Sequence, residues 1–345
     1  MLYSGDMREL VTVSVGELGA ELGAEYWGLV AAEHGLAGGG GGYTGYRLGC
    51  SSWAQLASLD TVWAEQRDGS YTARAVTLPG GGGGDAGAEL LRREVERCDQ
   101  LQGLLLCHAL SCWAPDWAEQ VRDLCPASPL ATFSVLDTAD PRRLSSLLAA
   151  ADSVAVLAPA APAHLAARAM AGVTAPLRLP ARVTSSLQQL QASTAPLPRL
   201  NLLQPSLAPA SSCGRGAPLQ LPQLAAQLLS PDTRLCAGLV PGGGRQLAMA
   251  SVFRGRDISW AELDCLMRAV SWRPCWRGRC TVTSDRCVQA EGGAGCGLAS
   301  HDLVTVASPC HPRSATLLAN SAGAASYLDT VARGVERCRS RYMIK

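Results

Sequence analysis

The first strand and helix of the chain can be predicted from its pattern of apolar and polar residues. Residues 9–15 are mostly apolar and β-branched, which predicts a strand. Glycines at both ends of 16–19 predict a tight turn there. After this turn, apolar residues recur on one face of a helix: Leu22, Tyr26, Leu29 and Val30. A strand, a glycine turn and a helix open nucleotide-binding α/β folds, because free amides at the helix N-terminus can hold phosphate.

The same patterns predict alternating strands and helices along the rest of the chain. Further strands are expected at 61–63, 73–77, 101–109, 130–136, 154–157, 200–203 and 247–253. Helices are expected at 89–99, 116–124, 144–151, 163–171, 185–191, 221–228, 260–270 and 325–339. Two glycine runs, Gly38–Gly42 and Gly80–Gly84, are predicted to be a loop and a linker. This alternation predicts the α/β class.

Length, composition and charge narrow the possible classes of protein. A chain of 345 residues, 48% of them hydrophobic, can form one large domain or two ordinary ones. The formal net charge of +1 favours neither nucleic acid nor an acidic membrane as a partner. The start of the chain already carries Asp6, Arg8 and Glu9, so we expect no signal peptide. We also find no apolar run of the roughly 18 residues that a spanning helix needs.

Several kinds of catalytic chemistry are excluded by the residues that are present. The chain has one lysine, Lys345, which excludes an internal phosphate-loop or Schiff-base lysine. The five histidines do not form a metal-binding His-x-x-x-His pattern, and His34 and His108 are expected to be structural. Glu94 and Glu96 on a predicted helix are most simply a solvated face.

The 14 cysteines are expected to be free, buried thiols in a reducing cytosol. A denser group could alternatively be interpreted as a metal site: Cys275, Cys280, Cys287, Cys296, Cys310 and His311. Its spacing contains no Cys-x-x-Cys pair, so we favour structural thiols over zinc.

A set of short motifs follows one order along the chain. They are Met7–Glu9, Gly16–Gly19, Gly23, Trp27, Glu33–Gly35, Glu96–Gly103, Thr132–Val135, Pro196–Leu200 and Ala248–Arg256. With these motifs the chain resembles the tubulin family, closest to the β type. The match is almost gapless from Gly172 to Asp264 and fades after Ser271.

The resemblance implies a particular fold and domain organisation. We expect an α/β, tubulin/FtsZ-like fold, with a reduced Rossmann-like nucleotide domain over 1–158 and an α+β second domain over 159–323. The break at Pro159–Pro162 marks the boundary, and 324–345 is expected to be a C-terminal helix, truncated relative to the family. The long central helix of the family matches the short helix predicted at 163–171.

The family's phosphate-binding loops are altered in this chain. Gly16, Glu17 and Gly19 are expected to be a residual phosphate loop, in which Glu17 replaces a glutamine of the family. The main glycine-rich cradle is replaced by Ser111–Pro115, where Trp113 is bulky and the proline has no N–H to donate. This loop is not expected to hold phosphate as the family does.

The family's residues for guanine and for hydrolysis are also replaced. The two asparagines that read guanine match Pro159 and Ala163. In the loop that completes a neighbouring subunit's site, the polar residues match Thr184 and Ser186, and the hydrolytic glutamate matches Gln189. The family implies GTP or GDP, with Mg²⁺ only where nucleotide binds, but these replacements predict little or no tight binding.

The resemblance therefore predicts a structural or interaction protein of the cytoplasm and cytoskeleton. Its expected partner is an α-type tubulin subunit or a microtubule-associated assembly, and it is not expected to hydrolyse GTP. Two alternatives remain open: a GTP-binding microtubule subunit, and a non-functional, decayed tubulin paralogue. Arg254 and Arg256, which flank Gly255, are expected to form a structural turn with ion pairs, or else a subunit contact.

Overall fold

The structure is a computed structural model, and it is described for most of the chain between residues 9 and 333. The described ranges are 9–37, 43–48, 56, 59–80, 84–113, 115–138, 140–181, 186–196, 200–211, 219–236, 246–271, 279–283, 287–291, 298–321, 323–324, 327–329 and 332–333. The loop expected at Gly38–Gly42 lies outside these residues, as does most of the helix expected at 325–339.

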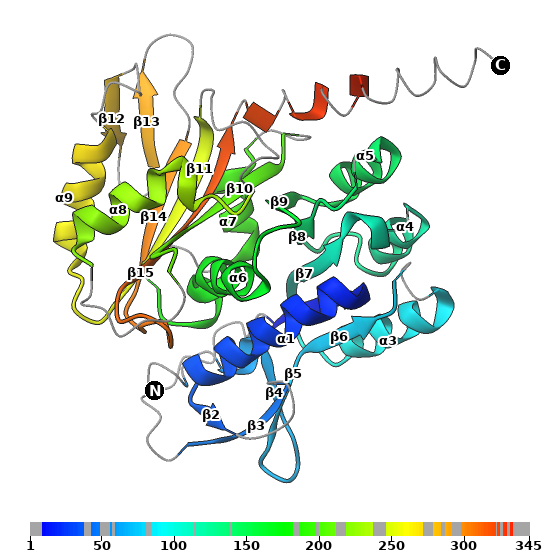
Figure 1. Cartoon of the computed structure of the whole chain (residues 1–345). Coiled ribbons are helices and arrows are strands. Elements are labelled where there is room, and N and C mark those ends of the chain that lie inside the picture. Colours follow the sequence, from blue (N-terminus) through cyan, green and yellow to red (C-terminus); the bar gives the residue numbers. More distant parts are fainter. Residues whose placement is uncertain are drawn as a thin grey trace.

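One large sheet runs through the molecule (Figure 1). Its 11 strands follow the order β12-β13-β14-β11-β15-β10-β9-β8-β7-β1-β6. The strands are β1 (Glu9–Val15), β6 (Ala75–Leu78), β7 (Leu101–Ala109), β8 (Leu130–Val135), β9 (Ser153–Leu157), β10 (Leu202–Ala208), β11 (Gln246–Arg254), β12 (Arg279–Thr283), β13 (Cys287–Glu291), β14 (Leu298–Val304) and β15 (Ser314–Ser321). From β6 to β10 every pair is parallel, whereas β15 is antiparallel to both β10 and β11.

Helices cover both faces of this sheet. They are α1 (Gly16–Glu33), α3 (Gly84–Glu96), α4 (Pro115–Leu124), α5 (Pro141–Ala150), α6 (Ala163–Arg178), α7 (Leu187–Thr194), α8 (Leu221–Leu229) and α9 (Trp260–Ser271). In β7, Leu105 and Cys107 pack in the core under α1 and α6, while Leu104 and Leu106 pack in the core under α3, α4 and α5. This alternation is the strand period of two, and it makes the sheet the middle layer of three.

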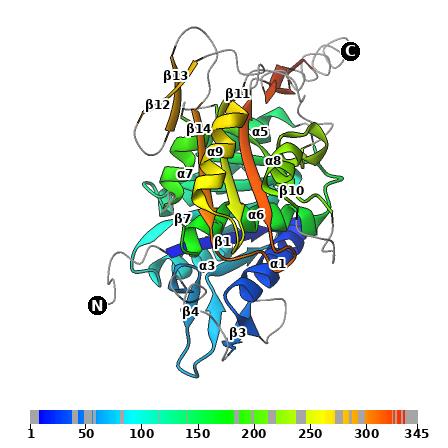
Figure 2. The same ribbon diagram turned by 90° about the vertical axis from the view of Figure 1, so that its left-hand side faces the viewer.

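A second, smaller sheet lies beside α1 (Figure 2). It contains β2 (Leu36–Ala37), β3 (Thr44–Arg47), β5 (Tyr71–Ala73) and β4 (Trp63–Glu65), in that order. Among the described helices, none has the length and apolar character needed to cross a membrane. The predicted α/β class is confirmed by the large, mostly parallel sheet and its flanking helices.

Some predicted boundaries are wrong, and each error has a physical cause. The expected turn at 16–19 is instead the first turn of α1, because Gly16 alone reverses the chain with a φ of +72°. The strand predicted at 73–77 is two strands, because the chain leaves the small sheet at Ala73 and joins the large one at Ala75. The strand predicted at 61–63 is also divided: a 3-10 turn ends at Thr61, and β4 begins at Trp63.

The helix predicted at 163–171 is longer than expected and ends at Arg178. Pro176 lies inside its last turns, at a position where proline normally breaks a helix. The helix continues because its residues from Ala166 onward are buried between α1 and the sheet, and packing outweighs local propensity. Figure 1 shows α6 and α1 side by side across the middle of the molecule.

The predicted domain boundary falls within the continuous large sheet. β9 and β10 pair directly through Leu202 with Val154 and Leu203 with Ala155, and residue 158 follows the end of β9. The division into 1–158, 159–323 and 324–345 therefore stays a prediction.

Close packing of α1 on β7 depends on Gly19. A Cβ placed on this glycine would lie 2.4 Å from the carbonyl oxygen of Cys107, a backbone atom that cannot move aside easily. A Cβ on Gly28, in the same helix, would meet no atom within 4 Å. The two glycines therefore have different roles, although both lie within α1.

We predict opposite effects of alanine at these two positions. Gly19→Ala should lower the free energy of unfolding by about 1–3 kcal/mol, because α1 must move away from β7. Gly28→Ala should raise it by about 0.5–1 kcal/mol, because alanine restricts the unfolded chain. Urea unfolding followed by circular dichroism measures both, and a shift of the same sign in both variants would contradict the packing assigned to Gly19.

Candidate functional site

The candidate site lies where the parallel strands of the large sheet end. The carboxyl ends of β1, β6, β7, β8 and β9 meet at one edge, because these strands are all parallel. Open α/β sheets bind ligands at this edge, in the loops that follow the strands. The predicted residual phosphate loop at Gly16 belongs to it, as does the loop after β7, where the resemblance places the main phosphate cradle.

The N-terminus of α1 keeps some features of a phosphate site. Val15 is the N-cap and gives no side-chain hydrogen bond to the first turn. Free amides and the helix dipole favour an anion at such an end. Glu17 is exposed in this first turn, and Gly19 is buried against β7. The N-terminus of α1 can therefore attract an anion, although the carboxylate of Glu17 lies beside it and would repel one.

The space next to Gly16 is filled by the side chain of Cys112. A Cβ built on Gly16 would lie 2.6 Å from the Cys112 sulfur and 3.7 Å from the Cα of Gly80. Three loops, which follow β1, β6 and β7, therefore meet at this point. A phosphate that approached Gly16 from this side would collide with the thiol.

The loop after β7 is held in place by hydrogen bonds from its neighbours. The backbone N–H of Ser111 donates to Asp137 Oδ1 at 2.9 Å, and the Ser111 hydroxyl donates to Asp137 Oδ2. Arg143 donates to the carbonyl oxygen of Trp113 at 3.1 Å and also to that of Ser111. Because its amide and carbonyl groups are used in this way, the loop is not free to wrap around a ligand.

Trp113 is part of the core below this loop. Its side chain is 1% exposed, and its ring centroid lies 5.1 Å from that of His108 and 5.8 Å from that of Trp117. Its indole N–H donates to Ser146 Oγ at 3.4 Å. An aromatic ring therefore packs where the resemblance places a glycine-rich phosphate cradle.

The remaining residues matched to the family's nucleotide site supply few groups to a nucleotide. Pro159 is exposed after β9 and Ala163 begins α6, and neither side chain can hydrogen-bond guanine. Ser186 is the N-cap of α7 and accepts from the amide of Gln189 at 3.2 Å. Thr184 lies outside the described residues. Together with the filled space at Gly16, these residues do not fit a guanine nucleotide in the way that the resemblance implies.

A serine–histidine contact in the sheet was not foreseen from the sequence. His108 Nδ1 lies 3.0 Å from the carbonyl oxygen of Ala109, so Nδ1 carries the proton and donates to it. Nε2 then accepts from Ser134 Oγ at 2.9 Å, and Thr132 lies 3.0 Å from that hydroxyl. His108 and Ser134 are both 0% exposed, and burial lowers the pKa of His108 to about 4. A neutral, enclosed pair of this kind holds neighbouring strands together and does not meet a substrate.

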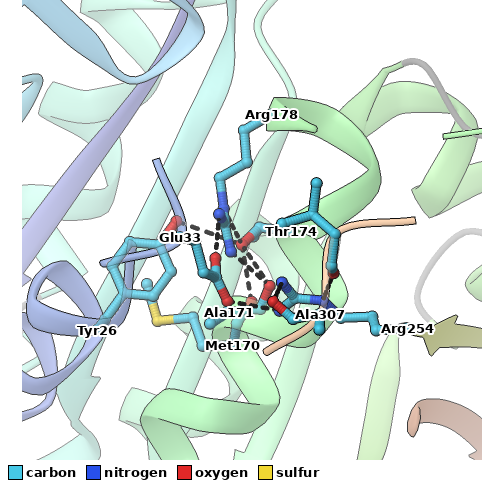
Figure 3. A network of polar contacts seen from close by, with 9 residues as sticks. Tyr26, Glu33, Met170, Ala171, Thr174, Arg178, Arg254 and Ala307 are labelled. Atoms are coloured by element: carbon cyan, nitrogen blue, oxygen red, sulfur yellow. Dashed lines mark hydrogen bonds and ion pairs between the residues drawn. The ribbon is translucent and has the colours of Figure 1, made fainter. Parts of the chain in front are cut away.

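The turn at Arg254–Arg256 contains one buried and one exposed arginine. Arg254 is 2% exposed and points into the molecule, whereas Arg256 is exposed. Arg254 Nη1 lies 2.5 Å from Glu33 Oε1, and Arg178 forms an ion pair with the other oxygen of the same carboxylate (Figure 3). The expected ion pair is confirmed, and a subunit contact through Arg254 is wrong because its guanidinium is enclosed.

Each guanidinium in this cluster is also bonded to the backbone or to a hydroxyl. Arg178 donates to the Ala171 carbonyl at 2.7 Å and to Thr174 Oγ1 at 3.3 Å. Arg254 donates to the Val306 carbonyl at 3.3 Å. Burial alone would raise the pKa of Glu33, but the charges of Arg178 and Arg254 outweigh it and hold the pKa below its usual value. The carboxylate therefore stays ionised between α1, α6 and β11.

The cysteines agree only in part with the expectation of free thiols. The free cysteines in the described part of the chain are Cys98, Cys107, Cys112, Cys125, Cys236 and Cys265. Cys310 is disulfide-bonded and Cys265 is exposed, so the expectation of a free, buried thiol is wrong at both positions. Pairing needs two cysteines at bonding distance, which the sequence alone does not reveal.

The alternative of a metal site falls mainly on residues that cannot be described. The side chains of Cys275, Cys280, Cys287 and Cys296 lie outside the described part of the structure. Within the described ranges, no group of three or more His, Cys, Asp or Glu side chains could hold a metal ion.

We predict that Glu33→Gln is strongly destabilising. The amide would leave two buried guanidiniums without a counter-charge, which typically costs about 3–5 kcal/mol of unfolding free energy. Glu89→Gln is the matched control, because Glu89 forms its ion pairs with Arg92 and Arg93 in solvent. In urea unfolding at neutral pH, the control should resemble the parent. If Glu33→Gln is as stable as the parent, the cluster of Glu33, Arg178 and Arg254 does not stabilise the fold.

We also predict a pH dependence of stability that arises from His108. The unfolded chain binds a proton at a histidine pKa near 6.5, whereas the folded pKa is about 4. Between these values the unfolded state binds more protons, so stability should fall as the pH is lowered, by up to about 1.4 kcal/mol per unit. The contribution of Glu33 lies lower, because its depressed pKa matters only below the usual carboxylate range.

Urea unfolding at several pH values between 7 and 4.5 tests this assignment. His108→Gln should flatten the dependence, since glutamine does not titrate but can still accept from Ser134. His164→Gln, at an exposed histidine in the first turn of α6, should keep the parent's slope. Equal slopes in the two variants would remove His108 as the source.

The surroundings of Gly16 thus combine an uncapped helix end with a space filled by the protein's own side chains. No protein-family model matches the sequence. The proposal of a function therefore depends on the resemblance, the fold and the geometry of this site.

Proposed function

We propose that this protein is a tubulin-like interaction protein of the cytoskeleton, which associates with α-type tubulin or microtubules and does not hydrolyse GTP. The proposal is supported by the positions of the elements in the stretch that resembles the family most. Strands were expected near 200–203 and 247–253 and helices near 221–228 and 260–270, and β10, β11, α8 and α9 lie there or overlap closely.

The loop after β7 supports the proposal that the protein does not hydrolyse GTP. Cys112 fills the space beside Gly16, and Trp113 is buried under the same loop. A nucleotide would have to displace both side chains and break the hydrogen bonds that hold Ser111 to Asp137. Each lost charge-assisted contact with phosphate is worth about 1.5–3 kcal/mol, so affinity falls steeply when the cradle is gone.

One observation favours the alternative of a GTP-binding microtubule subunit. The N-terminus of α1 has no side-chain cap, and Gly16 adopts a φ that brings the chain directly into the helix. Backbone amides at such an end can bind phosphate weakly. The alternative of a decayed paralogue predicts instead a chain that does not unfold cooperatively.

Two measurements on the full-length protein test the proposal. Native purification, denaturation and ion-exchange chromatography of the supernatant should yield no stoichiometric GDP or GTP. Sedimentation with polymerised tubulin should carry the protein into the pellet. Arg256→Glu should reduce this co-sedimentation, because Arg256 is the exposed arginine of the turn after β11, whereas Arg67→Glu in the distant turn before β5 should not.

The possible outcomes separate the three candidates. A stoichiometric nucleotide peak would replace the proposal with the GTP-binding subunit. A well-folded, nucleotide-free protein that stays in the supernatant would reject association with polymerised tubulin. Absence of a cooperative unfolding transition would favour the decayed paralogue.

A further inference from the structure

A small pocket lies where β9 and β10 end. These two strands are parallel, so their carboxyl ends meet at the edge of the sheet where α/β proteins bind ligands. The pocket has a volume of about 230 Å³, which is below the roughly 300–1,000 Å³ of drug-sized sites and suits a smaller molecule. It is not the site at Gly16, because neither Gly16 nor Cys112 lines it. Pro159 and Ala163, the positions matched to guanine recognition, do not line it either.

Most of the described lining of this pocket is apolar. Three leucines come from different elements: Leu165 from α6, Leu207 from β10, and Leu235 from the segment after the 3-10 turn at Pro231–Thr233. The rest of the apolar lining is alanine and proline. A surface of this kind stabilises a hydrocarbon group by removing it from water.

One guanidinium, that of Arg234, lines the same pocket. The side chain is half-buried, and its Nη1 atom is buried without a hydrogen-bond partner among the described residues. The backbone beside it is fixed, because the N–H of Leu235 donates to the Pro205 carbonyl at 2.9 Å and the N–H of Ala158 donates to the Leu235 carbonyl at 2.8 Å. A buried cationic donor is costly when it has nothing to bind. Arg234 is therefore held in position, with a nitrogen available to an anion.

Two further features make the potential around the pocket positive. Pro162 and Leu165 belong to the start of α6, and the N-cap Pro162 gives no side-chain hydrogen bond, so the positive end of the helix dipole lies beside the pocket. One turn further along α6, Arg168 is 5% exposed and binds only carbonyl oxygens among the described residues. It donates to Pro209 at 2.9 Å and to Ser211 at 2.6 Å.

Asp232 limits the negative charge that the pocket can accept. Its carboxylate is exposed in the lining and accepts a hydrogen bond from Ser230 Oγ at 3.4 Å. It forms no ion pair with Arg234. A ligand with two negative charges would therefore be repelled by Asp232, whereas a ligand with one can bind Arg234 and keep its distance.

We infer that this pocket binds a small monocarboxylic acid with an apolar tail. The carboxylate of the ligand binds the guanidinium of Arg234 near the N-terminus of α6, and the tail contacts Leu165, Leu207 and Leu235. Binding supplies Arg234 with a counter-charge that no described residue provides. The inference depends neither on association with tubulin nor on the site at Gly16.

Isothermal titration calorimetry of the full-length protein with four probes tests the inference. Hexanoate has both the charge and the tail, and it should bind saturably at one site. Hexanol lacks the charge, acetate lacks the tail, and adipate adds a second carboxylate. Each of these three should bind at least roughly tenfold more weakly than hexanoate, because each loses one of the required contacts or gains repulsion.

Substitution of Arg234 tests the contact with the carboxylate. Arg234→Met should weaken hexanoate roughly tenfold or more, while Arg234→Lys, which keeps the charge, should retain part of the affinity. Arg67→Met, at an exposed arginine in the turn before β5, is the matched control and should change nothing. Urea unfolding should show that Arg234→Met is at least as stable as the parent, because the substitution leaves no partner unpaired. A large loss of stability would make the guanidinium structural and overturn its assignment to a ligand.

Two other substitutions test the tail and the choice of charge. Ala160→Trp, at an exposed position of the lining, should fill the pocket and abolish binding, whereas Ala32→Trp, at an exposed position of α1, should not. Asp232→Asn should bring the affinity for adipate closer to that for hexanoate.

Three results would overturn the inference. They are no saturable binding of hexanoate up to about 10 mM, equal binding of hexanol, and full binding by Arg234→Met or Ala160→Trp. Binding of inorganic phosphate in preference to hexanoate would also overturn it, because that result would assign Arg234 to a phosphate site.

Discussion

Glu33 is the point at which three distant parts of the chain are joined. It stands at the last residue of α1 and binds Arg178 at the last residue of α6 and Arg254 at the last residue of β11. Removing two guanidiniums and a carboxylate from water is costly, so the cluster is tolerated only when all three are paired and further bonded. Once formed, it fixes the direction of α1 relative to the second half of the sheet. The other end of α1 is Gly16, so this cluster also helps to position the loops at the candidate site.

Those loops are arranged as in a ligand site, but the protein's own side chains fill the space where a ligand would bind. In nucleotide-binding α/β proteins, the edge where parallel strands end is left open for phosphate, and the bound ligand adds to stability. Here Cys112, Trp113 and the hydrogen bonds between Ser111 and Asp137 occupy that edge. Contacts within the chain thus take the place of contacts with a ligand. A protein built in this way is stabilised at this edge without a bound ligand, which is the physical basis of the proposed absence of nucleotide.

The elements that were predicted well are those whose patterns are long and local. β1 and β7 have the expected limits because each is a long, mostly apolar run that begins directly after a polar residue, Arg8 or Gln100. The split at Arg74 was not predictable, because it depends on the pairing of Ala73 with β4 in one sheet and of Ala75 with β1 in the other. The length of α6 depends on burial beneath α1, and the partner of Arg254 lies 221 residues away in the sequence. At the site, the bulk of Trp113 was visible in the sequence, but the filling of the space beside Gly16 by Cys112 needs three loops to be placed in space.

The position of β15 has a consequence for how the chain is made. The strands from β6 through β1, β7 and β8 to β9 are all complete once residue 157 has been synthesised. In contrast, β15 is inserted between β10 and β11, and it ends only at Ser321. During translation, β10 and β11 are complete once Arg254 has been added, but β15 has not yet been synthesised. Until β15 is added, β10 and β11 therefore each expose an unpaired strand edge. Such open edges attract other strands. Chaperones that shield nascent sheets would be most needed in the interval between residues 254 and 321.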